Sequence, residues 1–437
     1  MRENASKKFK KTKLLLAVML AFMLSMSFAP AAYADPIEPG DISEAAITKI
    51  LKVPVGTDVP TVTFTFDVVG VSINDDPSLQ SSVPVVGTAS ASFPSGSYQA
   101  IETVGDSTYY CLETAELFGG IVWPHTGIFE YMITELPSGY ALVAGETLTE
   151  SLAVYRVRVH VREDATTGDL YIWGIGAYRI IEDDGTDIGP VGEKVDPTPG
   201  GGSNPAWDYS QMTFGNIYTK HKGGGGEDPN MDTLTISKIV GGDYSSVSYY
   251  FDYSLTINKP SLVDAAITSY RAYIVEGSPA TVVTNLTPNK VAAGLIATDS
   301  SGVTCINVPI GTAFTFALQH GQSLVFTNAH VGANYTITEF GVSGYLPKVT
   351  VTSNGATPGV IDGALSSDFT VPDGTVILTN PLVGEASNSV AFNNRADGIG
   401  ETGITIENLP FIGIIALAIL GLGAFIFVRS RKRRLEN

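Results

Sequence analysis

Two lysines in this sequence lie on the apolar side of predicted β-strands. In LTISKIV (residues 234–240), alternation places Lys238 on the face that carries leucine, isoleucine and valine. In AITKILKV (residues 46–53), it places Lys49 on the corresponding apolar face. An unpaired ammonium group inside a protein core costs several kcal/mol. Each lysine therefore needs either a buried partner or a reaction that removes its charge.

A glutamate and an asparagine also occupy apolar faces, once in each half of the chain. The related phrases YMITELPSGY and YTITEFGVSGY place Glu135 and Glu339 on faces shared with tyrosine and isoleucine. Near the end of each half, MTFGNIY and SVAFNNR place Asn216 and Asn394 beside phenylalanine. In the last phrase Asn393 is the alternative partner, although alternation favours Asn394. The order lysine, glutamate, asparagine thus occurs twice.

These residue types could join a lysine to an asparagine through an amide bond. Burial disfavours charged forms, so it lowers the pKa of a lysine and raises that of a glutamate. The neutral amine can attack the asparagine amide while the glutamic acid polarises the carbonyl group and transfers protons. Ammonia leaves, and the buried charge disappears. Such a reaction occurs once per site within the protein itself and is not enzymatic turnover. The alternative for each lysine is a strand edge from which the ammonium group reaches water.

In this order the residues resemble the isopeptide-containing domains of Gram-positive pilins, including the streptococcal T-antigen type of backbone pilin. The resemblance rests on the Y-x-I-x-E phrases and the closing F-x-N phrases, and it covers most of the chain between its two ends. It implies Ig-like or CnaB-like β-sandwich domains. The implied cross-links are Lys49 to Asn216, assisted by Glu135, and Lys238 to Asn394, assisted by Glu339.

Short β-strands must position these groups. Val, Ile, Thr, Tyr and Phe recur in alternating runs such as YRVRVHV, separated by turn sequences such as EDDGTD. The predicted fold class is all-β, with two tandem β-sandwich domains. Cys111 and Cys305 are the only cysteines and lie in separate halves, which excludes a disulfide framework. The turn EDDGTD lacks most ligand positions of a calcium loop, so we predict no metal and no cofactor.

The glycine-rich stretch KHKGGGGEDPN marks the clearest boundary in the chain. It separates two halves that look like divergent copies of one domain. The predicted organisation is a signal peptide (1–34), a first isopeptide β-sandwich domain (45–222), a linker (223–231), a second isopeptide β-sandwich domain (232–396), a sorting-signal-like segment (397–408), a transmembrane helix (409–428) and a basic cytoplasmic tail (429–437).

The two ends predict export and membrane attachment. A lysine-rich start, the apolar run Leu14–Phe28 and the motif AYA are typical of a secretory signal cut after Ala34. The apolar run Leu409–Val428 is long enough to span a membrane, and the basic RSRKRRLEN after it predicts a cytoplasmic end. Once the 11 basic and three acidic residues of the ends are set aside, 15 basic and 41 acidic residues remain, a net charge of −26. This charge argues against nucleic-acid binding.

The segment IGETG, directly before the apolar run, resembles a degraded L-P-x-T-G sorting signal with Ile and Gly in place of Leu and Pro. In the pilin family a sortase cuts between the threonine and the glycine, here Thr402 and Gly403, and joins the chain to another pilin or to peptidoglycan. The alternative is a protein that keeps its membrane helix. The resemblance also implies a lysine for linkage between subunits, and Lys194 in GEKV lies in a comparable place.

The predicted function is that of a cell-surface pilin or stalk subunit of a Gram-positive cell. Its expected partners are a sortase, other pilin subunits or peptidoglycan, with membrane contact through the C-terminal helix before sorting. The alternative is an anchored adhesin whose first-domain loops, containing Trp123 and Trp207, bind a host protein or glycan. The sequence leaves the apolar core open as the other place for both tryptophans. An enzyme is disfavoured because the five histidines form no HExxH motif and no G-x-S-x-G or Cys/His arrangement is present.

Overall fold

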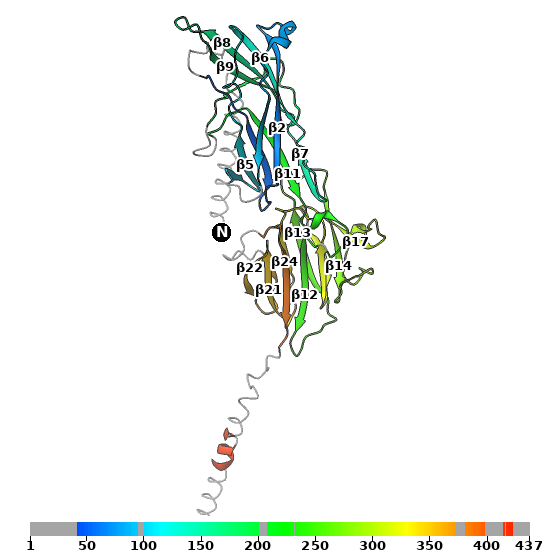
Figure 1. The fold of residues 1–437 in the computed structure, drawn as a ribbon. Helices are drawn as coiled ribbons and strands as arrows, with labels where there is room; N and C mark the ends of the chain where they lie inside the picture. The colour runs from blue at the N-terminus through cyan, green and yellow to red at the C-terminus, as the bar shows by residue number, and fades with distance from the viewer. Residues whose placement is uncertain are drawn as a thin grey trace, which may run out of the picture.

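A computed structural model describes residues 42–94, 100–200, 208–230, 232–371, 381–397, 414–415 and 417–422. Over this part of the chain nearly all regular structure is β-strand, which confirms the predicted all-β class. The strands form two β-sandwiches that follow one another along an elongated molecule (Figure 1). The short 3₁₀ helices among the described residues are η1 (Pro77–Ser82), η2 (Lys222–Gly225) and η3 (Ala293–Leu295).

The first sandwich packs two sheets face to face. One sheet has the order β4 (Glu102–Val104), β5 (Ser107–Glu113), β1 (Thr48–Pro54), β11 (Thr213–Lys220) and β7 (Glu146–Thr149). The other has the order β10 (Glu193–Val195), β9 (Leu170–Ile181), β8 (Val154–Glu163), β6 (Gly127–Leu136), β2 (Val62–Ile73) and β3 (Thr88–Phe93).

The second sandwich has the same general plan. Its larger sheet has the order β16 (Ile296–Thr298), β17 (Thr304–Pro309), β14 (Ser269–Glu276), β19 (Gln322–Phe326), β12 (Leu234–Gly241), β24 (Ser389–Arg395), β21 (Leu346–Ser353) and β22 (Ala356–Asp362), with β15 (Thr281–Val282) beside β14. Its smaller sheet has the order β18 (Phe314–Leu318), β13 (Phe251–Asn258), β20 (Asn334–Glu339) and β23 (Phe369–Val371).

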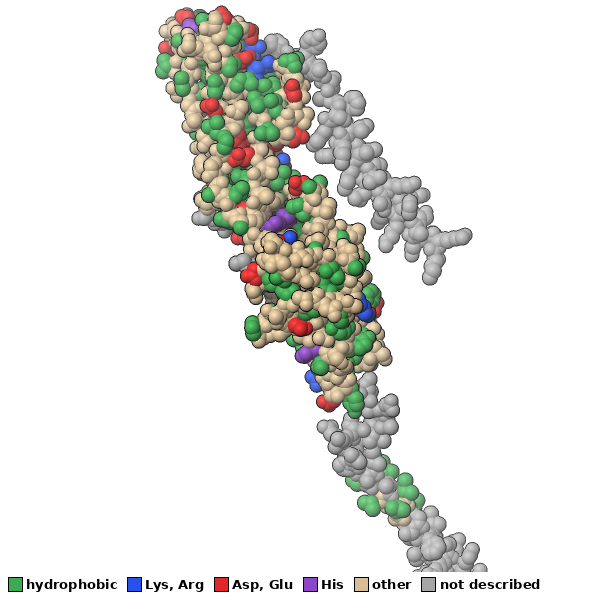
Figure 2. Space-filling view, turned by 90° about the vertical axis from the view of Figure 1, so that its right-hand side faces the viewer, with side chains coloured by type: hydrophobic (Ala, Val, Ile, Leu, Met, Phe, Trp, Pro, Cys, Tyr) green, Lys and Arg blue, Asp and Glu red, His purple; other side chains and the backbone are tan. Residues whose placement is uncertain are grey.

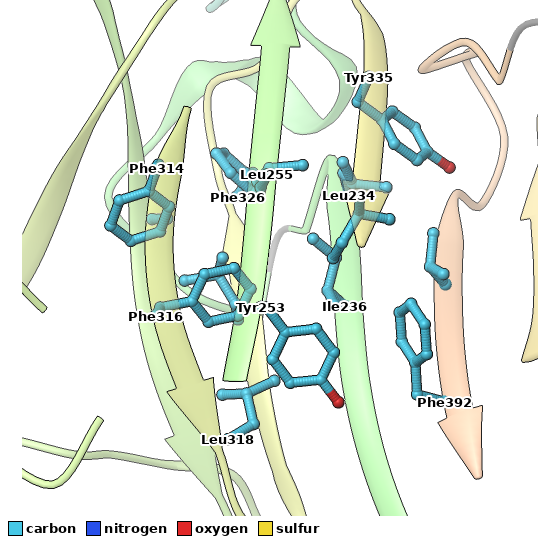
Figure 3. Packing of buried hydrophobic residues seen from close by; sticks show 14 of the residues in the cluster. Leu234, Ile236, Tyr253, Leu255, Phe314, Phe316, Leu318, Phe326, Tyr335 and Phe392 are labelled. Atoms are coloured by element: carbon cyan, nitrogen blue, oxygen red, sulfur yellow. The ribbon is translucent and has the colours of Figure 1, made fainter. Parts of the chain in front are cut away.

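Each sandwich has its own apolar core. Alternation along β8 buries Tyr155 and the three valines that follow it at every second position, as YRVRVHV predicts. In the second core, residues of β12, β13 and β24 meet between the two sheets (Figure 3). Burying each large aliphatic or aromatic side chain stabilises the fold by roughly 1.5–3 kcal/mol. The two sets of buried residues come from separate halves of the sequence, so each half folds around its own interior.

The first and last strands of each sandwich are parallel neighbours. In the first sandwich β1 pairs with β11, and in the second β12 pairs with β24. Both pairs lie inside their sheets and not at an edge. Because the two strands of a pair run in the same direction, the chain enters each sandwich at one end and leaves it at the opposite end.

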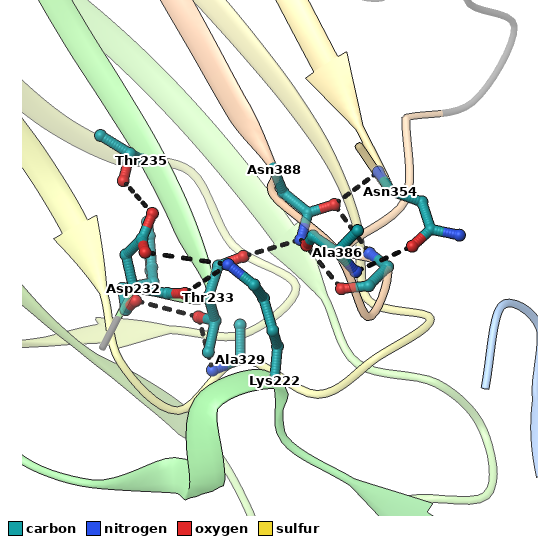
Figure 4. Close-up of polar contacts among 10 residues, drawn as sticks. Lys222, Asp232, Thr233, Thr235, Ala329, Asn354, Ala386 and Asn388 are labelled. Atoms are coloured by element: carbon teal, nitrogen blue, oxygen red, sulfur yellow. Dashed lines mark hydrogen bonds and ion pairs between the residues drawn. The ribbon is translucent and has the colours of Figure 1, made fainter. Parts of the chain in front are cut away.

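The entry to the second sandwich is fixed by a buried asparagine (Figure 4). The Asn388 amide donates hydrogen bonds to the carbonyl oxygens of Thr233, Gly384 and Ala386, at 2.9–3.0 Å. Its Oδ1 accepts from the backbone N–H groups of Asn354 and Gly384. This side chain satisfies buried backbone groups where no strand ladder can. It therefore ties the start of β12 to the turn before β24.

The two sandwiches meet through specific contacts. The N–H of Val331 donates to the carbonyl oxygen of Lys220 at 2.9 Å, and the Lys220 ammonium pairs with Glu385. A second contact joins the sandwiches where the N–H of Ser261 donates to Asp106 Oδ2 at 2.7 Å. The glycine-rich stretch is also held, since the Lys222 ammonium donates to the Asp232 carbonyl oxygen at 2.8 Å (Figure 4). Charged and backbone contacts thus connect the sandwiches.

Two histidines face each other at this junction. His221 and His330 form an antiparallel bridge, and their ring centroids are 3.9 Å apart. Burial lowers the pKa of His221 to about 4 and that of His330 to about 3, and the neighbouring His221 also lowers the pKa of His330. The folded junction therefore holds both rings neutral at physiological pH.

We expect the free energy of unfolding to fall as the pH drops from about 6.5, the usual histidine pKa, towards 4. In this window the unfolded chain binds two protons that the folded junction excludes, so acid favours the unfolded state. Urea unfolding of the wild type and of a His221→Gln/His330→Gln variant across pH 7 to pH 4 measures the effect. The variant should lose part of the pH dependence. Identical pH profiles for the two proteins would contradict this role of the pair.

Several predicted segments lie outside the described residues. These are the signal peptide (1–34), Thr402 and Gly403 of the sorting-like segment, Trp207 and the basic tail (429–437). Of the predicted membrane helix, Leu409–Val428, only 414–415 and 417–422 are described, and these residues are helical and exposed. Within the described residues no helix has the length and hydropathy of a membrane span.

Acidic side chains are scattered along the face drawn in Figure 2.

Candidate cross-linking site

The first candidate site joins three strands of the first sandwich. Lys49 lies on β1, Asn216 lies on the neighbouring β11, and Glu135 lies on β6 of the opposite sheet. In the parallel ladder Lys49 is level with Phe214, so Asn216 lies one inward-facing position further along. Alternation turns all three side chains into the space between the sheets.

The glutamate bridges the other two groups. Lys49 Nζ donates to Glu135 Oε2 at 2.6 Å, and Asn216 Nδ2 donates to Glu135 Oε1 at 2.6 Å. One carboxyl group thus holds the lysine nitrogen and the asparagine amide at the same time. This arrangement brings a nucleophile and an acyl group together beside an acid–base group.

The second sandwich repeats this arrangement. Lys238 lies on β12, Asn394 on β24 and Glu339 on β20. Lys238 is level with Phe392, as Lys49 is with Phe214, so the asparagine has the same offset in both ladders. Lys238 Nζ donates to Glu339 Oε1 at 2.6 Å, and Asn394 Nδ2 donates to the same oxygen.

Burial distinguishes Asn394 from Asn393, the two asparagines of FNN between which the sequence left the choice of cross-link partner. Asn394 is buried against Glu339, whereas Asn393 is exposed on the outer face of β24. None of the six side chains of the two sites is more than 2% exposed. They are therefore far from the strand-edge position in which a lysine would reach water.

Aromatic rings complete the walls of both sites. Lys49 Nζ lies 4.4 Å from the centroid of the Phe64 ring, and Lys238 Nζ lies 3.8 Å from that of Phe251. A ring face attracts a cation, but it cannot replace the water that a lysine loses on burial. These rings mainly exclude solvent from the reacting groups.

Burial shifts the proton equilibrium within each site. Desolvation lowers the pKa of Lys49 and of Lys238, although the facing carboxylate opposes this change. Desolvation also raises the pKa of Glu135 and Glu339, against the effect of the lysine. Both shifts favour the neutral pair, a free amine next to a carboxylic acid. The neutral amine is the form that can attack an amide carbon.

Sequence patterns did not reveal one contact of the first site. The backbone N–H of Ser151 donates to Asn216 Oδ1 at 2.7 Å, so the amide oxygen has its own hydrogen-bond donor. Asp183 holds this region in place by accepting from Ser151 Oγ and from the N–H of Gly215. A loop N–H has no side-chain signature, so strand alternation could not identify it.

The other predicted residues lie apart from the two sites. Lys194 is exposed on β10. Cys111 and Cys305 are buried and unpaired. Trp123 packs against Phe129 in the first core rather than standing on a loop surface. In the part of the chain that the structure describes, no group of His, Cys, Asp and Glu side chains is placed to hold a metal ion.

Comparisons with known proteins give a partial match. A family model described as "Domain of unknown function (DUF7601)" matches residues 232–371 and so ends before β24. No curated protein matches the chain. Similar solved structures include a major pilin from Streptococcus pyogenes, with 16% identity, 82% of this chain and 100% of that chain covered, and a TM-score of 0.29. The T3.2 major pilin of the same species has 17% identity, coverages of 81% and 99%, and a TM-score of 0.28. A pilus-presented adhesin has 11% identity, coverages of 80% and 100%, and a TM-score of 0.24.

Proposed function

We propose that each sandwich forms an intramolecular lysine–asparagine amide bond, and that the protein is a structural subunit of a cell-surface pilus or stalk. One observation carries the proposal: a buried lysine, glutamate and asparagine occur twice, on equivalent strands and with the same ladder offset. Two lysines without exposure to water are difficult to explain as permanent charges. They are readily explained as reactants.

The reaction balances without an external reagent. The lysine passes one proton to the glutamate and becomes a neutral amine, which attacks Cγ of the asparagine. The glutamic acid then gives this proton to the departing Nδ2 group, and the resulting carboxylate takes the second proton that Nζ loses on becoming an amide nitrogen. The bond from Cγ to Nδ2 breaks, ammonia leaves, and a bond from Cγ to the lysine Nζ remains. Water-excluding aromatic walls favour this outcome over hydrolysis of the amide.

The position of the bonds suits a protein that carries tension. Closing a loop of roughly 160 residues stabilises a domain by about 5 kcal/mol in the chain-entropy model. In each sandwich the bond would also join the first strand to the last, directly between the points where the chain enters and leaves. A pulling force would then pass through a covalent bond rather than through the hydrogen bonds of the sheet.

Attachment to the cell is a further part of the proposal. The sequence predicts export, sorting at Thr402–Gly403 by a sortase, and transfer to another pilin subunit or to peptidoglycan. Lys194 is exposed on an edge strand, as an acceptor of such a transfer must be. The retained membrane helix is the alternative to sorting.

Intact mass spectrometry of the protein released from cells with their own sortases tests both parts of the proposal. We expect a chain that begins at Asp35, ends at Thr402 and weighs two ammonia molecules less than its sequence. A mass without this deficit would contradict the cross-links. A chain that still carries RSRKRRLEN and extracts only with detergent would contradict sorting while leaving the cross-links intact.

A further inference from the structure

The two candidate sites differ in what faces the asparagine oxygen. In the first site the Ser151 N–H donates a hydrogen bond to Asn216 Oδ1. In the second site, among the described residues, Asn394 Oδ1 has no hydrogen-bond partner. The hydroxyl group of the fully buried Tyr253 and Oε2 of Glu339 have no well-aligned hydrogen bond either, although the hydroxyl lies close enough to the Glu339 carboxyl group to interact with it. Three polar atoms without a well-aligned hydrogen bond therefore belong to the second site or to its immediate neighbour.

Tyr253 occupies a position that corresponds to a phenylalanine in the first sandwich. Tyr253 lies opposite Glu339 in the ladder of β13 and β20, and Phe66 lies opposite Glu135 in the ladder of β2 and β6. Their rings also pack alike, because the centroid of Tyr253 is 5.2 Å from that of Phe392 on β24. Phe66 lies 4.9 Å from Phe214 on β11. The second site thus has one additional hydroxyl group, and the first site has one additional backbone donor.

The Tyr253 hydroxyl is suited to donate. Burial and the neighbouring Glu339 carboxyl raise the tyrosine pKa far above its usual value, so the group keeps its proton. Figure 3 shows this hydroxyl on the side of the ring that faces β12 and β24, which carry Lys238 and Asn394. A buried hydroxyl without a well-aligned hydrogen bond costs up to about 1–3 kcal/mol. A phenylalanine, as in the first sandwich, would avoid this cost.

We propose that the Tyr253 hydroxyl donates a hydrogen bond to Asn394 Oδ1 while the cross-link forms, the part that the Ser151 N–H plays for Asn216. The inference rests on the proposed cross-linking function. Attack by Lys238 Nζ moves the carbonyl electron pair onto Oδ1, which becomes negatively charged. The electron pair returns when the bond to Nδ2 breaks and ammonia leaves. Tyr253 keeps its own proton throughout, and its hydrogen bond stabilises the charge that develops on Oδ1.

The test compares two tyrosines of the same domain. Tyr253→Phe removes the proposed donor and keeps the ring. Tyr335→Phe is the matched control, because its hydroxyl belongs to an equally buried tyrosine and also has no partner in the described structure. Cells producing the full chain are pulse-labelled, quenched in acid at intervals and digested. Mass spectrometry then quantifies the linked peptide pair of each domain.

We expect Tyr253→Phe to slow formation of the Lys238–Asn394 pair by about 10²-fold. The Lys49–Asn216 pair of the same molecules should form at the wild-type rate, and Tyr335→Phe should leave both rates unchanged. A purely structural role predicts a different result, so thermal unfolding is compared in a Lys238→Ala background, where no bond can form in the second domain. There, Tyr253→Phe should cause no loss of stability.

Two results would overturn the inference. One is a wild-type rate for the second pair in Tyr253→Phe, and the other is an equal slowing of both pairs, which would indicate a general folding defect. The absence of both linked pairs from the wild type would instead contradict the proposed function, and this inference with it.

Discussion

A chain with Glu339→Ala should weigh one ammonia molecule less than its own sequence, where the wild type weighs two less, and its second sandwich should unfold at a much lower temperature. Without the carboxyl group, no neighbour takes the proton from Lys238, so the amine stays charged and does not attack Asn394. The domain then loses about 5 kcal/mol of loop-closure stabilisation. It also keeps an unpaired buried ammonium group, which costs about 3–5 kcal/mol when one partner of a buried pair is removed.

Glu135→Ala should have the same effect on the first sandwich, and the double variant should retain both ammonia molecules. Asp362→Ala provides a control, because this carboxylate pairs with Lys348 on the surface of the second sandwich. Exposed pairs contribute only about 0–1 kcal/mol, so the control should still weigh two ammonia molecules less than its own sequence and keep nearly the wild-type stability. A Glu339→Ala protein that still loses two ammonia molecules would show that the carboxyl group is not required.

The second large effect concerns mechanical extension. Pulled by its two ends in a single-molecule experiment, the wild-type second sandwich should lengthen very little, because Lys238 and Asn394 are joined. With Asn394→Ala no bond can form, and the roughly 155 residues between these positions should extend by about 500 Å once the sheet fails. The parallel pairing of β12 and β24 means that the force shears this ladder along its length.

Asn393→Ala is the matched control for the pulling experiment. It removes the same type of side chain from the same strand, but from the exposed face. This variant should resist extension as the wild type does. A wild-type domain that gives the full extension, or an Asn394→Ala domain that does not, would contradict the proposed path of force.

Alternation along single strands explains why the burial of the lysines and of Glu339 could be predicted from the sequence. Lys49, Lys238 and Glu339 interrupt apolar faces whose period of two is unambiguous, and the structure buries all three. The two sandwiches follow from the same short-range patterns together with the turn sequences between them. The inward direction of a side chain depends only on its neighbours in sequence, so a single strand is enough to predict it.

Features that depend on pairing between distant segments could not be predicted. FDYSLTIN alternates, so Tyr253 would be expected to point inward, but its place opposite Glu339 depends on a ladder between residues more than 80 positions apart. The Ser151 N–H belongs to a loop backbone. The contact between His221 and His330 exists only after both sandwiches have folded and met. The sequence did not decide whether Trp123 lies in a loop or in the core, and only its packing against Phe129 places it in the core.

The central position of the last strand also has a consequence for the proposed export. A protein that leaves the cell N-terminus first delivers β1 or β12 early and β11 or β24 last, yet the late strand lies beside the early one inside the sheet. Until the late strand emerges, the lysine has no asparagine to attack, and the sheet lacks one of its inner members. Contacts this distant in sequence form slowly, so the bond can close only after the whole domain has been translocated. The covalent bond would then mark a domain as completely exported, the first domain being sealed while the second is still crossing the membrane.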